Sequence, residues 1–258
     1  MLGFMPALNP ITALAQNKFD DNESGLLAAP IFFDNFNAAG LDANKWRKGT
    51  NGGNQAAVIN GALELRSQGA ENGRIITKNF YKARNTIVQI KVAKPSNDAA
   101  LGMSPTVNLA SKNGVADQKN WYRFYVYRNG ASGPYRLFVQ WKKNGVEKGL
   151  DATGSLVING AVYLRLRVDH KNIYFEASLN GSAWSKAYSE IFALPGYTPD
   201  SMFYYELTAY NTAMNGTARL DDFSINALPP DTAPPKISLV TSQNIASTSA
   251  QIKWQTNE

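Results

Sequence analysis

The sequence predicts an all-β protein built as a two-sheet antiparallel β-sandwich, and three observations support this fold class. Apolar residues occupy every second position of 162–168, a period of two that gives a strand one apolar and one polar face. A polar turn at 169–172 follows, and alternation then resumes from Ile173. The 258 residues also include 20 glycines and 12 prolines, clustered with Asn and Ser between short strands. Strands that bury one face each require two sheets packed against each other.

Composition excludes several kinds of chemistry. The chain has no cysteine, which excludes disulfides, thiol catalysis and cysteine-bound zinc. The single histidine, His170 in the predicted turn, excludes a multi-histidine metal site and leaves no spare base for a serine-type triad. The net charge is +6, but no run of Lys and Arg exceeds two residues and no nucleic-acid motif is present, so we expect no nucleic-acid partner. No apolar run approaches the ~18 residues of a membrane span.

The first 30 residues lie outside the predicted sandwich. Residues 1–15 are mostly apolar and end in Ala13-Leu14-Ala15 before Gln16, a small-residue pattern that signal peptidase reads. The basic start of an export signal is missing, and two prolines interrupt the apolar run. The segment is either the remnant of an export signal or an apolar leader without structure. We favour the export signal and therefore expect a secreted or cell-surface protein, with 16–30 as a spacer.

The predicted sandwich domain spans 31–228 and contains short strands at close intervals. Alternation and turn residues place them, in chain order, at 31–36, 62–66 (after Asn60-Gly61), 86–92, 121–128 paired with 135–142 across Asn129-Gly130, 162–168 paired with 173–177 before a tight turn at Asn180-Gly181, 202–210, and 218–225.

A proline linker and a short tail follow this domain. Residues 229–235 read PPDTAPP, a stiff linker, and 236–258 contain two more predicted strands. The DTAPP lead-in, Ser247-Thr248-Ser249-Ala250 and Trp254 resemble the start of a fibronectin type III domain. Two strands are too few to bury a sandwich core. We therefore expect an incomplete immunoglobulin-like module, with further domains of the same polypeptide beyond it.

The strands at 162–177 and the two ends of the main domain resemble the concanavalin A-like lectin/glucanase (LamG-like) jelly rolls. The resemblance rests on the LRLRVDHKNIYFEAS hairpin, on Asp34-Asn35-Phe36 near the first strand and on LDDFSI in the last strand. It implies a jelly roll over 31–228 whose first and last strands pair. A jelly roll followed by a fibronectin-type module is the usual arrangement in secreted bacterial proteins that degrade polysaccharides or adhere to them. This arrangement implies a polysaccharide or glycoconjugate partner.

Alternation also assigns side chains to an outer, solvent-facing surface suited to sugars. Aromatic rings pack on the apolar faces of pyranose rings, and guanidinium, amide and carboxylate groups bond to their hydroxyls. An excess of Arg and Lys favours acidic glycans. The expected ligand-binding residues are Trp121, Arg123, Tyr125, Tyr127, Arg136, Gln140, Tyr163, Arg165, Tyr204 and Glu206.

Two enzyme families share the jelly-roll fold that the sequence resembles. Family-16 glucanases need a Glu-x-Asp-x-(x)-Glu strand, and this chain has none. Three segments resemble the jelly-roll polyuronate (alginate) lyases: 64–66, 89–91 and 203–211. That resemblance implies that Arg66 and Gln89 grip a uronate carboxylate and that Tyr210 transfers the proton. Lys91 and Glu206 stand where this family has His and Lys, which speaks against catalysis.

Asp34 and Asp222, in the first and last strands, are the candidate ligands of a structural Ca²⁺, because calcium prefers hard oxygen ligands. No other cofactor is expected. The sequence thus predicts a non-catalytic carbohydrate-binding module of a secreted multidomain protein. The alternatives are a polyuronate lyase-like enzyme of the same fold and a structural or adhesin spacer domain.

Overall fold

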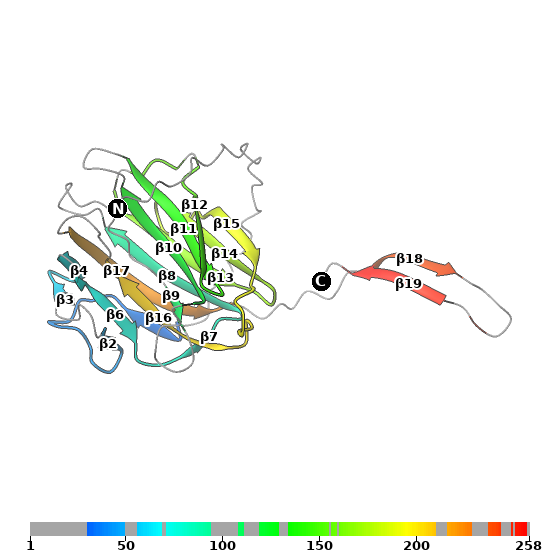
Figure 1. Cartoon of the computed structure of the whole chain (residues 1–258), viewed down its shortest axis with the longest axis horizontal. Helices are drawn as coiled ribbons and strands as arrows, with labels where there is room; N and C mark the ends of the chain where they lie inside the picture. Colours follow the sequence, from blue (N-terminus) through cyan, green and yellow to red (C-terminus); the bar gives the residue numbers. More distant parts are fainter. Residues whose placement is uncertain are drawn as a thin grey trace. The chain divides into compact units, whose positions relative to one another are not determined.

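The computed structural model describes residues 30–49, 56–68, 71–93, 108–110, 119–128, 134–154, 156–158, 160–209, 216–228, 237–243, 249 and 251–256. The regular elements in these ranges are antiparallel strands, so the predicted all-β sandwich is confirmed (Figure 1). The chain forms two compact units, Met1–Leu228 and Pro229–Glu258. Among the described residues there is no helix with the length and hydropathy to cross a bilayer.

One layer of the first unit is a nine-stranded sheet. Its strand order is β15-β14-β13-β8-β17-β4-β3, with β1 paired to β17 and β5 paired to β4. The bounds are β1 Phe32–Asp34, β3 Ala56–Ile59, β4 Ala62–Gln68, β5 Glu71–Asn72, β8 Thr86–Ala93, β13 Val162–Val168, β14 Asn172–Ser178, β15 Ser185–Ile191 and β17 Gly216–Ala227. The pairing of β1 with β17 joins the first and last strands, as the jelly-roll resemblance implies.

The second layer faces this sheet. It contains the run β10-β11-β12 and the run β2-β6-β16-β7, and β9 pairs with β16 while lying beside β10. The bounds are β2 Trp46–Lys48, β6 Arg74–Thr77, β7 Tyr81–Lys82, β9 Asn108–Ala110, β10 Trp121–Arg128, β11 Tyr135–Lys143, β12 Val146–Asp151 and β16 Met202–Thr208. The expected pairing of 121–128 with 135–142 is confirmed in register, from Trp121 opposite Lys142 to Arg128 opposite Tyr135.

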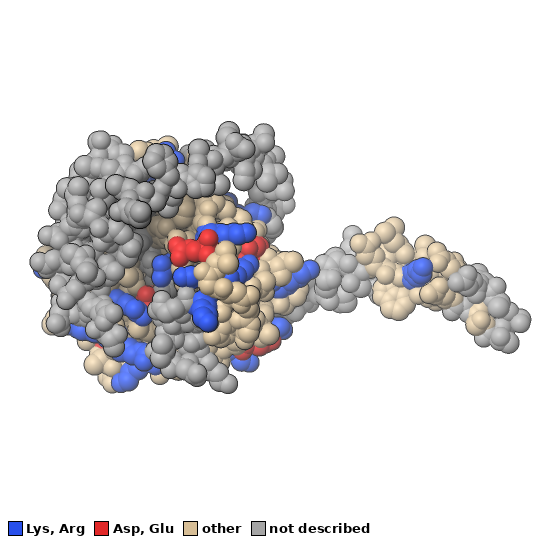
Figure 2. All heavy atoms as spheres, viewed as in Figure 1, with Lys and Arg blue, Asp and Glu red and all other residues tan. Residues whose placement is uncertain are grey.

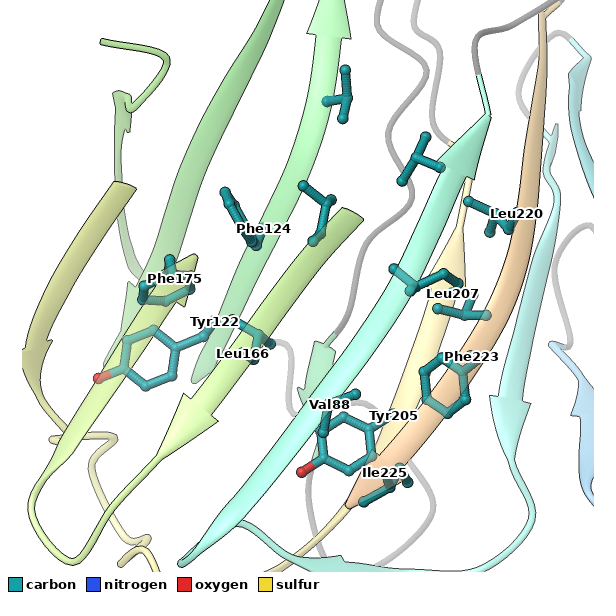
Figure 3. Packing of buried hydrophobic residues seen from close by; sticks show 14 of the residues in the cluster. Val88, Tyr122, Phe124, Leu166, Phe175, Tyr205, Leu207, Leu220, Phe223 and Ile225 are labelled. Carbon is teal, nitrogen blue, oxygen red and sulfur yellow. The ribbon is translucent and has the colours of Figure 1, made fainter. Parts of the chain in front are cut away.

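The core lies between the two layers and is rich in aromatic rings (Figure 3). Phe124 of β10 meets Phe175 of β14 edge-on, with ring centroids 5.8 Å apart. At the other end, Trp46 of β2 meets Phe223 of β17 at 5.1 Å. The inward residues expected from alternation in 86–92, 121–126 and 162–168 are buried. Burial of one face per strand therefore positions the opposite face of each strand outward.

The hairpin turns that the sequence predicts are only partly present in the structure. Asn60 and Gly61, between β3 and β4, both have positive φ angles (50° and 69°), as a two-residue hairpin of the primed type requires. Asn144-Gly145 forms a second such turn, between β11 and β12, which the sequence analysis did not anticipate. The tight turn expected at Asn180-Gly181 is wrong, because a loop over 179–184 joins β14 to β15 and only Gly181 in it has positive φ. The Asn180 side-chain oxygen accepts the Ser182 and Ala183 N–H groups, both at 2.9 Å, and stabilises this longer loop.

A bulge interrupts β17 where it pairs with β8. The register shifts between Asp221 and Ser224, and Asp222 adopts a positive φ of 49°. Leu220 before the bulge and Phe223 after it both point into the core. Regular alternation would have placed Phe223 outward, because side chains three residues apart in a strand face opposite sides.

The second unit contains one described hairpin, β18 (Ile237–Gln243) paired with β19 (Gln251–Thr256). Its large apolar side chains Leu239, Val240, Ile252 and Trp254 are exposed. The assignment of this unit to the fibronectin type III fold stays a prediction.

Candidate functional site

The outward side of the second layer carries the largest share of the predicted binding residues. We call it the aromatic–arginine face and define it by Arg47, Arg74, Trp121, Arg123, Tyr125, Arg136, Phe138, Gln140, Tyr204 and Glu206. These residues come from β2, β6, β10, β11 and β16, which lie in one layer. Figure 2 views the molecule from the side on which β10, β11 and β12 lie and shows cationic and anionic groups gathered near the middle of this side.

A buried ion pair lies at the centre of the face. Arg74 Nη2 is 2.6 Å from a carboxylate oxygen of Glu206, because β6 and β16 are neighbours with Glu206 opposite Ile76. Glu206 is only 4% exposed. Removing either partner would leave the other charge buried, so this pair holds the two strands' outer side chains in fixed positions.

Tyr204 lies beside this pair, two residues before Glu206 and on the same side of β16. The Arg47 guanidinium sits over its ring, 5.1 Å from the centroid, and Phe80 packs against it with ring centroids 5.8 Å apart. Tyr204 is 1% exposed, and its buried hydroxyl has no hydrogen-bond partner among the described residues. Burial and the Glu206 carboxylate raise the pKa of Tyr204, so its hydroxyl stays protonated and can donate.

Arg123 links the ion pair to the aromatic part of the face. Its guanidinium stacks on Trp121, 3.9 Å from the ring centroid. Burial lowers the pKa of Arg123, while the charges of Glu206 and Glu147 act in the opposite direction. The Arg123 cation is therefore held in a partly desolvated environment in which charge interactions are stronger than in water.

The aromatic part of the face continues on β10 and β11. Tyr125 and Phe138 are cross-strand partners with ring centroids 5.3 Å apart. The Phe138 ring lies over Gly149 of β12, where an added Cβ would stand 2.5 Å from Phe138 Cε1. The backbone of Tyr127 continues the same strand, and its side chain lies outside the described part. These rings form a platform of the kind that sugars pack against.

The charged groups nearer the edge of the layer are paired. Arg136 Nη1 is 2.6 Å from Asp151, which lies one strand away on β12. Gln140 donates to Glu147, and Lys142 is 3.8 Å from the same carboxylate. Hydrogen bonds from Thr153 and Arg136 lower the pKa of Asp151, although burial acts in the opposite direction.

Trp121, Tyr204 and Glu206 were expected on the outer side. They alternate with Tyr122, Tyr205 and Leu207, which lie in the core, so their side chains leave the strands on the outward side. All three are nevertheless buried, because neighbouring side chains such as those of Arg47, Arg74 and Arg123 lie against them. Arg47 and Arg74 themselves were not identified from the sequence. The sequence pattern that could have identified them is weak. It consists of two short stretches, 46–48 and 74–77, in which Arg47 and Arg74 each stand beside an apolar residue that is buried, Trp46 and Ile75.

Tyr163 and Arg165 do not belong to this face, because β13 lies in the nine-stranded sheet. Arg165 Nε is 2.7 Å from buried Glu176, and Arg167 Nη2 is 3.2 Å from the other oxygen of that carboxylate. The two guanidinium groups also stack on Trp184 (4.1 Å) and Tyr174 (3.9 Å). The Tyr163 ring packs on Gly181. The ten predicted binding residues therefore do not form one surface.

The residues expected for a lyase are also separated. Arg66 on β4 and Gln89 on β8 lie in the nine-stranded sheet, with β17 between their strands. Tyr210 lies outside the described residues, and β16, which ends at Thr208, belongs to the second layer. The described part of the chain therefore does not bring Arg66 and Gln89 together with the β16 segment.

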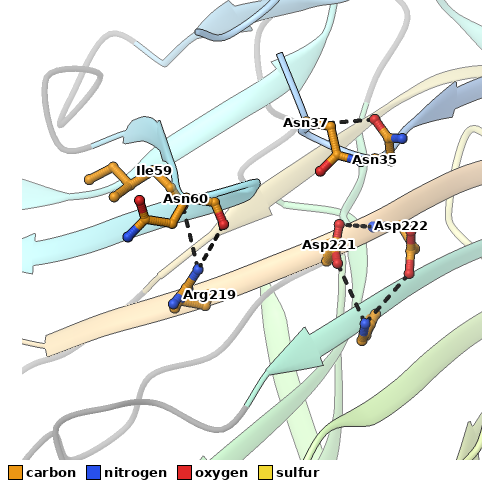
Figure 4. Close-up of polar contacts among 8 residues, drawn as sticks. Asn35, Asn37, Ile59, Asn60, Arg219, Asp221 and Asp222 are labelled. Atoms are coloured by element: carbon orange, nitrogen blue, oxygen red, sulfur yellow. Dashed lines mark hydrogen bonds and ion pairs between the residues drawn. The ribbon is translucent and has the colours of Figure 1, made fainter. Parts of the chain in front are cut away.

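The two candidate calcium ligands have protein partners of their own. Asp34 accepts the Phe36 N–H (2.9 Å) on one oxygen and the Trp46 indole N–H (2.8 Å) on the other. Asp222 lies 3.7 Å from the Lys91 ammonium, which also contacts Asp221 at 3.5 Å (Figure 4). The described residues contain no cluster of three His, Asp or Glu side chains arranged to hold a metal ion. Calcium binding stays a prediction, and the neighbouring ammonium group at Asp222 disfavours it.

Comparison with known proteins identifies the fold. No family model and no curated protein matches the sequence. Solved structures do match. They include SCLam, a non-specific endo-β-1,3(4)-glucanase from family GH16 (16% identity, TM-score 0.55, 78% of this chain and 91% of that one). An endo-β-1,3-glucanase from Pyrococcus furiosus matches with 13% identity and TM-score 0.56, over 77% and 94% of the two chains. A laminarinase from Flavobacterium sp. UMI-01 matches with 14% identity and TM-score 0.54, over 78% and 100%. At such low identities these matches show a glucanase-type jelly roll and nothing finer.

Proposed function

We propose that the jelly roll is a non-catalytic polysaccharide-binding domain and that the aromatic–arginine face is its binding surface. The observation that carries the proposal is the row of rings and guanidinium groups across β10, β11 and β16, with Tyr125 and Phe138 in mutual contact. Paired rings of this kind offer flat apolar area for pyranose rings, and the surrounding polar groups offer partners for hydroxyls. The glucanase-type fold of the structural neighbours supports a carbohydrate ligand.

The lyase alternative receives no support from the described geometry, since Arg66 and Gln89 lie in the other layer from β16. The spacer or adhesin alternative would need an exposed apolar patch for a protein partner. An extracellular location is part of our proposal, and it rests on the apolar leader ending at Ala15 and on the glycanase-like fold. Further domains of the same polypeptide remain part of the same proposal.

The test is binding of the whole chain to insoluble and soluble polysaccharides by affinity electrophoresis and calorimetry. Tyr125→Ala removes one ring of the platform, and we expect about tenfold weaker binding, the loss that corresponds to about 1.4 kcal/mol. Tyr163→Ala is the matched control, because it removes a tyrosine from the opposite layer. The control should bind like the parent chain.

Two results would overturn the proposal. One is the absence of binding across a panel of β-glucans, uronans and sulfated galactans, with and without calcium. The other is an equal loss in both variants, which would show that the rings on β10 are not the contact surface. Release of unsaturated uronate ends, followed as a rise in absorbance near roughly 235 nm, would instead favour the lyase-like alternative.

A further inference from the structure

Gly149 lies within β12, at a position where the backbone does not require glycine. Its φ lies outside the left-handed region, in contrast to that of Gly145 in the turn leading into the same strand, which is 81°. Glycine weakens a regular strand, because it loses more backbone freedom on folding than other residues and offers no side chain to pack. The reason for glycine at this position is therefore the space that a side chain would take.

That space is occupied by the ring of Phe138. A Cβ atom at residue 149 would stand 2.5 Å from Phe138 Cε1 and 2.9 Å from Cζ, well inside the usual contact distance of about 3.5–4.0 Å between carbon atoms. Gly149 lies opposite Gln140, and Phe138 lies opposite Asp151, so the ring reaches across the diagonal between β11 and β12. Outward side chains usually stand away from a sheet, whereas this ring lies against the β12 backbone.

The Phe138 ring is held from both neighbouring strands. On the other side of β11 it meets Tyr125 of β10, with 5.3 Å between ring centroids and 42° between ring planes. Both side chains are half-buried, so part of each still reaches solvent. A Cβ at residue 149 would also stand 3.2 Å from the Val139 carbonyl oxygen, which belongs to the sheet backbone, so the Phe138 ring is the group that would have to move. The surface that the two rings present to a ligand therefore depends on residue 149.

We propose that Gly149 is a positioning residue of the polysaccharide-binding surface. The absence of a side chain at this position gives the Phe138 ring its place on β12, and this fixes the height and tilt of the platform that Phe138 forms with Tyr125. The inference rests on the proposed function, because it explains how the same surface is held in its binding shape. A ring laid over a glycine can also serve only to stabilise an edge strand, and β12 ends the run β10-β11-β12. The experiment separates these two roles.

The experiment is a double-mutant cycle in the whole chain. Gly149→Ala, Phe138→Ala and the double variant are titrated calorimetrically with laminarin, polygalacturonate and a carrageenan, and affinities are compared for each polysaccharide that binds the parent chain. We expect Phe138→Ala to bind about tenfold more weakly, like Tyr125→Ala, and Gly149→Ala to bind at least about fivefold more weakly. The double variant should bind no more weakly than Phe138→Ala, because the alanine at residue 149 then has no ring to displace.

Gly40→Ala is the matched control. Gly40 lies in the loop between β1 and β2, its φ is outside the left-handed region, and an added Cβ there would meet nothing within 4 Å. The control makes the same chemical change and should bind like the parent chain. Urea denaturation of every variant measures stability separately, so that a loss of affinity can be compared with any change in the free energy of unfolding.

Each contrary outcome has a separate meaning. Parent-like binding by Gly149→Ala, while Tyr125→Ala binds more weakly, overturns this inference and leaves the polysaccharide-binding proposal intact. A chain that loses stability but not affinity, or that folds only when Phe138→Ala is also present, assigns Gly149 to the stability of the edge strand and overturns it as well. A double variant weaker than Phe138→Ala overturns it because the effect would not pass through the ring. Absence of binding to all three polysaccharides overturns both proposals.

Discussion

Glu176→Gln tests whether the arginines of β13 serve structure rather than ligand binding. The Glu176 side chain is 8% exposed and is bound by Arg165 at 2.7 Å and Arg167 at 3.2 Å. Each charge-assisted hydrogen bond contributes about 1.5–3 kcal/mol, and the glutamine oxygen still accepts one hydrogen bond from a guanidinium group, which recovers part of that contribution. The two guanidinium groups keep some contact with water, so we expect the free energy of unfolding to fall by about 2 kcal/mol. This is less than the roughly 3–5 kcal/mol lost when one partner of a fully buried ion pair is removed.

Urea denaturation followed by circular dichroism measures this loss. With a denaturant slope of about 2–3 kcal/mol per molar, the midpoint should fall by about 0.7–1 M without a change in slope. Asp200→Asn is the control: its pair with Arg84 spans 2.8 Å but is half exposed, so its loss should stay below about 0.5 kcal/mol. The reasoning is refuted by a midpoint shift for Glu176→Gln no larger than that of the control, or by a loss of polysaccharide affinity with unchanged stability.

Two further substitutions, Asp169→Asn and Trp46→Phe, each remove the hydrogen bonds of one side chain, in the turn after β13 and in the core. Hydrogen bonds from the Asn172 and Lys171 N–H groups and the Tyr174 hydroxyl lower the pKa of Asp169 although burial opposes them. A lowered pKa in the folded state stabilises the fold above the ordinary aspartate pKa and loses that contribution as the pH falls through the folded value. Asp169→Asn should therefore lower the free energy of unfolding by about 1 kcal/mol at pH 7, measured by urea titration. The difference in unfolding free energy between the parent chain and the variant should disappear below about pH 4. A difference that does not depend on pH would contradict this reasoning. Trp46→Phe removes the 2.8 Å hydrogen bond from the indole N–H to Asp34 and should lower the free energy of unfolding by about 2–3 kcal/mol, measured in thermal scans. A change near zero would show that this hydrogen bond does not stabilise the fold.

The sequence was sufficient for what depends on neighbours along the chain. Alternation at 121–126 and 162–168 correctly separates inward from outward side chains, because the period of two is a local property of a strand. It also gave the pairing of 121–128 with 135–142, since a short connection favours adjacent antiparallel strands. The same reasoning could not assign strands to layers. Arg165 was thus grouped with Arg123, although β13 and β10 lie in different sheets.

The candidate site itself depends on strand order, which local patterns do not contain. Arg74 reaches Glu206 across 132 positions of sequence because β6 happens to pair with β16. Nothing in the stretches 46–48 and 74–77 indicates that their outward arginines share a surface with β10. The loop at 179–184 was misjudged for a different reason: Asn-Gly is compatible with a two-residue turn, but side-chain bonds of Asn180 to the following backbone stabilise a longer loop.

The bulge in β17 limits how this chain can change in length. The part of β17 before the bulge pairs with β4 and the part after it pairs with β1, so one strand supports two neighbours along the same edge. Losing a single residue at Asp221-Asp222 would place Phe223 two positions after Leu220, so regular alternation would keep Phe223 and Ile225 inward without a bulge. Losing both residues would place Phe223 directly after Leu220, and regular alternation would then turn Phe223 and Ile225 toward solvent, together with the register of β1. A deletion of one residue at this point should therefore be tolerated better than a deletion of two.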